Sequence, residues 1–132
     1  MENQTIIFVC EHGAAKSVVA SAYFNKLAAK NGLGIRSIAR GTHPDSELSP
    51  IAVAGLANDG LIPAETSPIK LSISDLDASQ HMVAFCNLAD EEYHRAFGVE
   101  HWDDIPNVSD GYEAARDAIV HKIEKLIEQL NS

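Results

Sequence analysis

Residues 6–17 read Ile6-Ile7-Phe8-Val9-Cys10-Glu11-His12-Gly13-Ala14-Ala15-Lys16-Ser17: an apolar run, a cysteine, a loop of small residues and a lysine. The run Thr5–Val9 is typical of a buried strand, and Ser17–Asn31 has the periodicity of a helix that stops at Gly32. A loop of this size can curl around one tetrahedral oxyanion, with backbone N–H groups and the helix N-terminus facing the oxygens. The field of the helix and the lysine favours the thiolate, the nucleophilic form of cysteine. The segment therefore predicts an oxyanion site with Cys10 as nucleophile.

Composition restricts the class of protein. The chain has 132 residues, of which 45% are hydrophobic, and this predicts one domain over residues 1–132 with a proper core. Its formal net charge of -9 argues against nucleic acid or an anionic membrane as a partner, because both need clustered Lys and Arg. The start of the chain has no basic region and its apolar run is short, so we expect a cytoplasmic protein without a signal peptide or membrane span.

The cysteines and histidines restrict the class of protein further. Cys10 and Cys86 are the two cysteines, too few for a disulfide framework, which fits a reducing compartment. The six histidines form no His-x-x-x-His pair, so we predict no metal and no cofactor.

Strands and helices alternate along the chain. Further strands are predicted at Ile35–Arg40, His81–Cys86 and Val99–Trp102. Further helices are predicted from the Ser49-Pro50 cap through Asn58, around Ser74-Asp75-Leu76, at Ala89–His94 and at Tyr112–Leu130, the last with an apolar stripe at Ala115, Ile119, Ile123, Leu126 and Leu130. The alternation predicts a single-domain α/β protein, a three-layer sandwich in which helices cover both faces of a four-stranded parallel sheet. Ligands of such sheets bind beyond the carboxyl ends of the strands, where the Cys10 loop lies.

Over essentially its whole length the sequence resembles the low-molecular-weight protein tyrosine phosphatases and the thioredoxin-type arsenate reductases that share their fold. The resemblance rests on the order and spacing of five segments: Cys10–Ser17, Ile38-Ala39-Arg40-Gly41-Thr42, Ser49-Pro50-Ile51-Ala52, 83–92 and His101-Trp102-Asp103-Asp104-Ile105-Pro106. It implies a phosphotyrosine phosphatase I-like fold. It also implies either hydrolysis of phosphomonoesters or reduction of arsenate.

The same resemblance implies roles for particular residues. Cys10 attacks phosphorus, Ser17 stabilises its thiolate, and Asp104 or Asp103 protonates the leaving group. The oxyanion is held by the loop residues Glu11, His12, Gly13, Ala14, Ala15 and Lys16. Separately, the position of Arg40 at the end of a neighbouring strand makes it a candidate to lend a guanidinium, the alternative being a solvent-facing arginine.

The chain departs from the family pattern in three respects: the loop arginine, the two residues after Cys10, and the acid together with the cysteine relay. Lys16 replaces an arginine that would offer a planar fork of donors, so we expect oxyanion binding to suffer less than catalysis. Glu11 should point outward, because a carboxylate facing the site repels phosphate. His12 donates to the oxyanion, pairs with Glu11 or is an exposed loop residue. Asp104 is separated from Pro106 by one residue more than in the family. Cys86 matches a relay cysteine, but the next relay position is Tyr93, so the full three-cysteine relay cannot operate.

Three functions remain open from the sequence. The first is a phosphatase-like protein that binds phosphate, sulfate or arsenate and hydrolyses phosphomonoesters, including phosphotyrosine, weakly through a Cys10 phosphoenzyme. The second is an arsenate reductase that uses Cys10 with Cys86 or an external thiol, a Cys10–Cys86 disulfide being one route. The third is an oxyanion-binding or regulatory module without catalysis.

Overall fold

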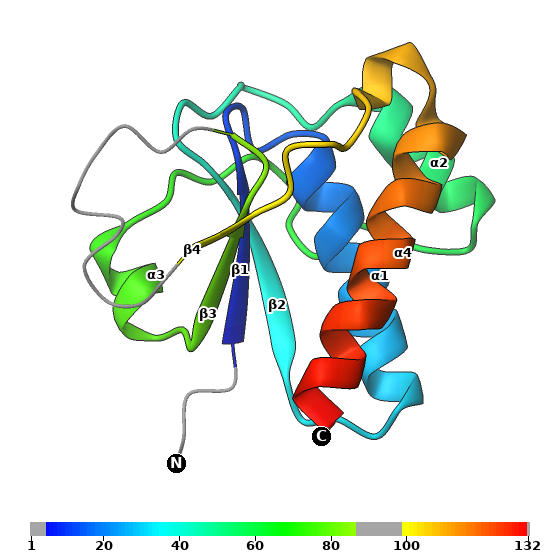
Figure 1. Cartoon of the computed structure of the whole chain (residues 1–132). Coiled ribbons are helices and arrows are strands. Elements are labelled where there is room, and N and C mark those ends of the chain that lie inside the picture. Colours follow the sequence, from blue (N-terminus) through cyan, green and yellow to red (C-terminus); the bar gives the residue numbers. More distant parts are fainter. Residues whose placement is uncertain (1–4, 87–98, 132) are drawn as a thin grey trace.

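The computed structural model describes residues 5–86 and 99–131, in which four strands form one parallel sheet in the order β2-β1-β3-β4 (Figure 1). The strands are β1 Thr5–Cys10, β2 Arg36–Gly41, β3 His81–Ala84 and β4 Val99–His101. The helices are α1 Lys16–Lys30, α2 Pro50–Asn58, α3 Ile73–Asp77 and α4 Tyr112–Asn131, with the short 3-10 turn η2 at Val108–Asp110. The predicted helix Ala89–His94 lies outside the described residues. The predicted α/β fold with a four-stranded parallel sheet is confirmed.

Strand β1 is the centre of the sheet and separates two apolar clusters. Its side chains alternate, so Ile6 and Phe8 join the cluster beneath α1 and α4, whereas Ile7 and Val9 join the cluster beneath α3. Figure 1 shows α1, α2 and α4 on one face of the sheet and α3 on the other. Both faces of β1 are therefore buried, which explains why its sequence is a continuous apolar run.

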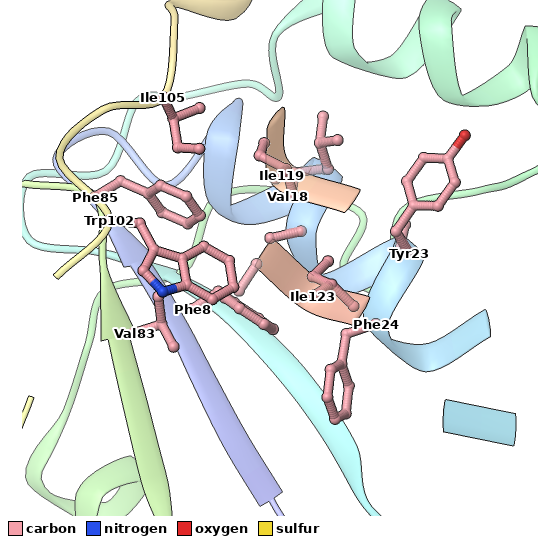
Figure 2. Packing of buried hydrophobic residues seen from close by; sticks show 14 of the residues in the cluster. Phe8, Val18, Tyr23, Phe24, Val83, Phe85, Trp102, Ile105, Ile119 and Ile123 are labelled. Carbon is pink, nitrogen blue, oxygen red and sulfur yellow. The ribbon is translucent and has the colours of Figure 1, made fainter. Parts of the chain in front are cut away.

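Aromatic rings fill the larger cluster (Figure 2). Phe8 contacts Phe24, Phe85 and Trp102, with ring centroids 5.9, 6.4 and 5.7 Å apart. Phe85 also meets Trp102 edge to face at 5.7 Å. Strand β3 ends at Ala84, two residues earlier than predicted, although the Phe85 N–H still donates to the Val9 carbonyl at 2.8 Å.

Local signals place two of the helices as predicted. Ser49 caps α2, since its hydroxyl accepts from the Ala52 N–H at 3.2 Å, and Pro50 occupies the first helical position. The predicted stripe of α4 is buried at Ala115, Ile119, Ile123 and Leu126.

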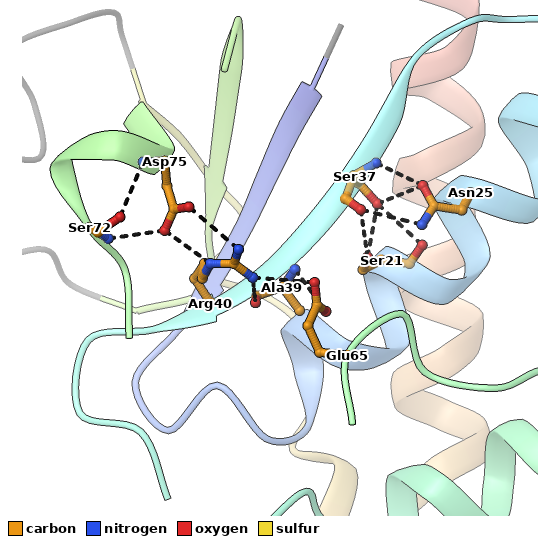
Figure 3. Close-up of polar contacts among 8 residues, drawn as sticks. All are labelled: Ser21, Asn25, Ser37, Ala39, Arg40, Glu65, Ser72 and Asp75. Atoms are coloured by element: carbon orange, nitrogen blue, oxygen red, sulfur yellow. Dashed lines mark hydrogen bonds and ion pairs between the residues drawn. The ribbon is translucent and has the colours of Figure 1, made fainter. Parts of the chain in front are cut away.

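A buried polar cluster holds α1 against β2 (Figure 3). The Ser37 N–H donates to the Asn25 side chain at 2.7 Å, and its hydroxyl donates to the Ser21 carbonyl at 3.2 Å. This cluster fixes the helix that follows the Cys10 loop relative to the sheet.

Asp59, directly after α2, binds three side chains from α1 and α4. It accepts hydrogen bonds from the hydroxyls of Tyr23 and Tyr112, the latter at 2.8 Å, and from the Arg116 guanidinium at 3.2 Å. The hydrogen bond from Tyr23 and the other donors hold the pKa of Asp59 below its ordinary value of 3.8. The carboxylate thus ties three helices together on one side of the sheet.

We expect Asp59→Asn to lower the free energy of unfolding at pH 7 by about 2–3 kcal/mol, because charged hydrogen bonds are lost and buried partners are left poorly satisfied. Since the folded-state pKa is lowered, this stabilisation is fully present above pH 3.8 and is lost as the pH falls below it. Urea denaturation at pH 7 and pH 3 should therefore show that the difference in free energy of unfolding between wild type and variant is smaller at pH 3. The exposed Asp103→Asn is the control and should change stability by less than about 0.5 kcal/mol. A difference in free energy of unfolding that stays constant with pH would contradict the stabilising role of the Asp59 carboxylate.

Candidate functional site

Cys10 ends β1, and the loop of residues 11–15 connects it to α1. The Cys10 Sγ is buried and lies 3.1 Å from the Ser17 Oγ in the first turn of α1. Gly13 reverses the loop with a φ of 61°, a conformation that favours glycine. A hydroxyl at this distance can donate to the cysteine when it is ionised, and this lowers the cost of a buried thiolate.

The carbonyl groups of the loop are occupied by the segment that follows β2. The N–H groups of Thr42, His43, Asp45 and Ser49 donate to the carbonyls of Cys10, Glu11, His12 and Ala14, at 3.2, 2.7, 3.0 and 2.9 Å respectively. Within the described part of the chain, the backbone N–H groups of residues 11–15 have no acceptor of their own. A loop with four of its carbonyls occupied and its amides free has donors available for an anion.

Two glycines allow the loop to lie close to the end of β2. A Cβ built on Gly41 would lie 2.6 Å from the Gly13 N, and a Cβ on Gly13 would lie 2.9 Å from the Gly41 N. Both contacts are with backbone atoms, which cannot rotate away. The close approach explains the glycines at both positions.

A cavity of about 710 Å³ opens at the carboxyl ends of the strands. Its described lining comes from four segments: the Cys10 loop with the start of α1, residues 45–50, Phe85-Cys86, and residues 107–109. Cys10, Glu11, His12, Ala14, Ala15 and Lys16 all border it. The structure thus brings most of the predicted loop residues to one cavity.

The charges around the cavity are mixed. Lys16 supplies a positive charge from its half-buried position and has no ion pair with any residue of the described segments. The acidic residues Glu11, Asp45 and Glu47 also border the cavity. The Glu11 side chain is 62% exposed and its carboxylate lies 3.9 Å from the His12 ring, which agrees with the expected outward orientation.

The structure does not bring Arg40 to the cavity. Its guanidinium forms ion pairs with Asp75 at 2.9 Å and Glu65 at 3.2 Å, on the α3 side of the sheet (Figure 3). A third bond runs to the carbonyl of Ala39 at 2.8 Å. With its donors used in this way, Arg40 is not placed to supply the guanidinium that Lys16 lacks.

Asp103 and Asp104 also lie away from the cavity. Their neighbours Trp102 and Ile105 are buried in the core, so the two aspartates between them face solvent. The Asp104 side chain is 74% exposed and its carboxylate binds the Lys122 ammonium at 3.2 Å. This hydrogen bond lowers the pKa of Asp104, the opposite of what a proton donor needs.

Residues 45–50 and 107–109 also line the cavity, and the sequence did not predict them as part of the site. Asn107 and Ser109 border the cavity, whereas the expected acid, Asp104, does not. The apolar residues Trp102 and Ile105 on either side of the two aspartates were a signal that the aspartates face solvent.

Cys86 borders the cavity that Cys10 borders. Burial, above all, raises the pKa of the Cys86 thiol to about 11, and the nearby Cys10 raises it further. Cys86 is therefore a protonated thiol near neutral pH.

The described segments contain neither a metal-ligand cluster nor a membrane-spanning helix. Residues 5–86 and 99–131 contain no group of three or more His, Cys, Asp or Glu arranged to hold a metal ion. None of the helices described is both long and apolar enough to cross a membrane.

Comparison with solved structures shows the same fold in several proteins. YfkJ from Bacillus subtilis superposes with a TM-score of 0.84 at 18% identity, covering 99% of this chain and 96% of that one. A low molecular weight protein tyrosine phosphatase from Streptococcus pyogenes gives a TM-score of 0.80 at 14% identity, covering 100% and 95% of the two chains. The thioredoxin-dependent arsenate reductase of Corynebacterium glutamicum gives 0.72 at 21% identity, covering 99% of this chain and 64% of that one.

A search of curated protein sequences found no match. The sequence model of the low molecular weight phosphotyrosine protein phosphatases, in contrast, matches residues 5–132. With the fold, the Cys10 loop and this match in agreement, the chain belongs to the low molecular weight phosphotyrosine protein phosphatase family.

Proposed function

We propose that the Cys10–Ser17 loop binds a tetrahedral oxyanion and that Cys10 hydrolyses phosphomonoesters slowly through a phosphocysteine intermediate. The observation that carries this proposal is the loop itself. Four of its carbonyls accept hydrogen bonds from residues 42–49, and its amides are free among the described residues. Cys10 borders the cavity, and its Sγ lies 3.1 Å from the Ser17 Oγ. Family membership supports the choice of a phosphatase-like reaction.

The reaction divides into two steps. The Cys10 thiolate attacks phosphorus while the P–O bond to the leaving group breaks, and the electron pair goes to the leaving oxygen. The loop amides and Lys16 hold the phosphoryl oxygens, and the Ser17 hydroxyl stabilises the thiolate. Water then attacks phosphocysteine, which releases phosphate and restores the thiolate.

Hydrolysis of 4-nitrophenyl phosphate and of phosphotyrosine tests the proposal. Wild type should turn over both, Cys10→Ser should lose turnover, and Cys86→Ser should keep it. Phosphate binding by calorimetry is measured in parallel. Equal rates for wild type and Cys10→Ser would rule out the covalent route, and phosphate binding without any turnover would replace the phosphatase with a non-catalytic oxyanion-binding module.

Reduction of arsenate is a second candidate, favoured by the position of Cys86 at the same cavity. Cys10 would bond to arsenic, and a second thiol would then attack Cys10, so that two thiols give up two electrons and arsenate becomes arsenite. Because Cys86 is a protonated thiol at neutral pH, an external thiol such as thioredoxin competes for this role.

Mass spectrometry after incubation with arsenate distinguishes these routes. A Cys10–Cys86 disulfide formed with stoichiometric arsenite supports the internal route, and arsenite formed by Cys86→Ser with added thiol supports the external one. If Cys10 is not oxidised by arsenate with thioredoxin, glutaredoxin or a small thiol present, the reductase hypothesis is wrong.

A further inference from the structure

His12 and Asp45 form a pair on the edge of the cavity that Cys10 borders. The His12 Nδ1 lies 3.2 Å from the Asp45 Oδ1. The Asp45 N–H also donates to the His12 carbonyl at 3.0 Å, so backbone and side chain both hold the two residues together. Both residues line the cavity.

The proposed phosphatase reaction needs a proton donor that the expected aspartates do not provide. Asp103 and Asp104 lie outside the cavity, and Asp104 is bound to Lys122. The wall at residues 107–109 presents Asn107 and Ser109, neither of which is a useful acid near neutral pH. Expulsion of an alkoxide or phenoxide without a proton would be slow.

We infer that His12 is the catalytic proton donor of the proposed phosphatase reaction and that Asp45 is its positioning residue. The inference rests on the proposed function. Nδ1 of the imidazole faces the Asp45 carboxylate, and Nε2, which lies 3.9 Å from the Glu11 carboxylate and has no hydrogen bond among the described residues, is left for the reaction. His12 thus takes the role that the resemblance to the phosphatases implied for Asp104 or Asp103.

The proton balance is complete with these groups. As the Cys10 thiolate attacks and the P–O bond breaks, the Nε2–H of the His12 imidazolium passes its proton to the leaving oxygen. In the second step the neutral imidazole takes a proton from the attacking water, the P–S bond breaks, and Cys10 leaves as the thiolate.

Other charged and titratable groups face the same cavity. The Glu11 carboxylate lies 3.9 Å from the His12 Nε2. Cys10, Lys16, Glu47 and Cys86 border the cavity from the other segments. A single pH profile therefore mixes several titrations, so the test compares two substrates in one protein.

The test is the ratio of kcat/KM for phenyl phosphate to kcat/KM for 4-nitrophenyl phosphate. Cys10 and Lys16 act on both substrates, so their contributions largely cancel in the ratio. Protonation of the leaving group, in contrast, speeds the release of phenolate far more than that of nitrophenolate. In His12→Gln the ratio should be at least about 100-fold lower than in wild type at the same pH.

Further variants separate chemistry from structure. Asp45→Asn should lower the ratio by a smaller factor than His12→Gln does, because the imidazole loses the carboxylate beside its Nδ1. Asp45→Glu should restore the ratio, whereas a merely structural role would not change the ratio of the two substrates. Asp104→Asn should leave the ratio unchanged. His12 is 58% exposed, so its substitution should not alter thermal unfolding.

The outcomes distinguish this inference from the proposed function. If wild type is active, Cys10→Ser is inactive and His12→Gln keeps the wild-type ratio, the phosphatase stands and the His12 inference is overturned. If wild type hydrolyses neither substrate, the proposed function fails and this inference fails with it. A low ratio in Asp104→Asn would assign the proton donor to Asp104 instead.

Discussion

Lys16→Arg should raise kcat/KM for aryl phosphates by about 100- to 1000-fold. A well-placed transition-state donor contributes about 2.7–4 kcal/mol, and the guanidinium offers two parallel donors where the Lys16 ammonium is a point charge on a flexible stem. Lys16 borders a cavity of about 710 Å³ and forms no ion pair with another described residue, so the substitution breaks no ion pair there. The phosphate Kd should change much less, since a lysine also binds phosphate well.

Steady-state kinetics with 4-nitrophenyl phosphate, beside calorimetric titration with phosphate, measures both quantities. Lys16→Gln is the matched control and should weaken binding and turnover together. The gain should vanish in Cys10→Ser/Lys16→Arg, because the guanidinium acts on a reaction that Cys10 carries out. An unchanged or lower kcat/KM in Lys16→Arg would mean that the Lys16 ammonium does not limit the rate of hydrolysis.

Local patterns in the sequence predicted the scaffold and the loop well. The apolar run of β1, the cap at Ser49 and the stripe of α4 depend on neighbours along the chain, and the structure confirms all three. The position of Cys10 at the end of the central parallel strand followed from the same reasoning. These features are decided by residue spacing and backbone preferences that act over a few residues.

Tertiary contacts decided what the sequence could not predict. Arg40 stands next to the Cys10 loop in strand register, yet its side chain points to Asp75 and Glu65, which come from segments far along the chain. Asp104 is turned outward because Ile105 is drawn into the core. The pairing of His12 with Asp45 depends on the path of the chain after β2, which no local pattern records.

The largest structural effect is expected at Gly41. A Cβ there would lie 2.6 Å from the Gly13 N, 2.8 Å from the Gly13 Cα and 2.9 Å from the His12 carbonyl carbon. All three are backbone atoms of the Cys10 loop, so the loop itself has to move away from β2. The bonds from residues 42–49 that orient its carbonyls would then be strained or broken.

We therefore expect Gly41→Ala to lower the free energy of unfolding by about 3 kcal/mol, the upper end for overpacking, and to weaken phosphate binding and turnover together. Gly34→Ala is the matched control, because no heavy atom lies within 4 Å of a Cβ at that position. It should be neutral or stabilise the protein by up to about 1 kcal/mol, since alanine has less conformational freedom in the unfolded chain. Urea denaturation and phosphate calorimetry of the two variants give the comparison. If Gly41→Ala unfolds like Gly34→Ala and still binds phosphate, the close packing of the loop on β2 is not what forms the anion site.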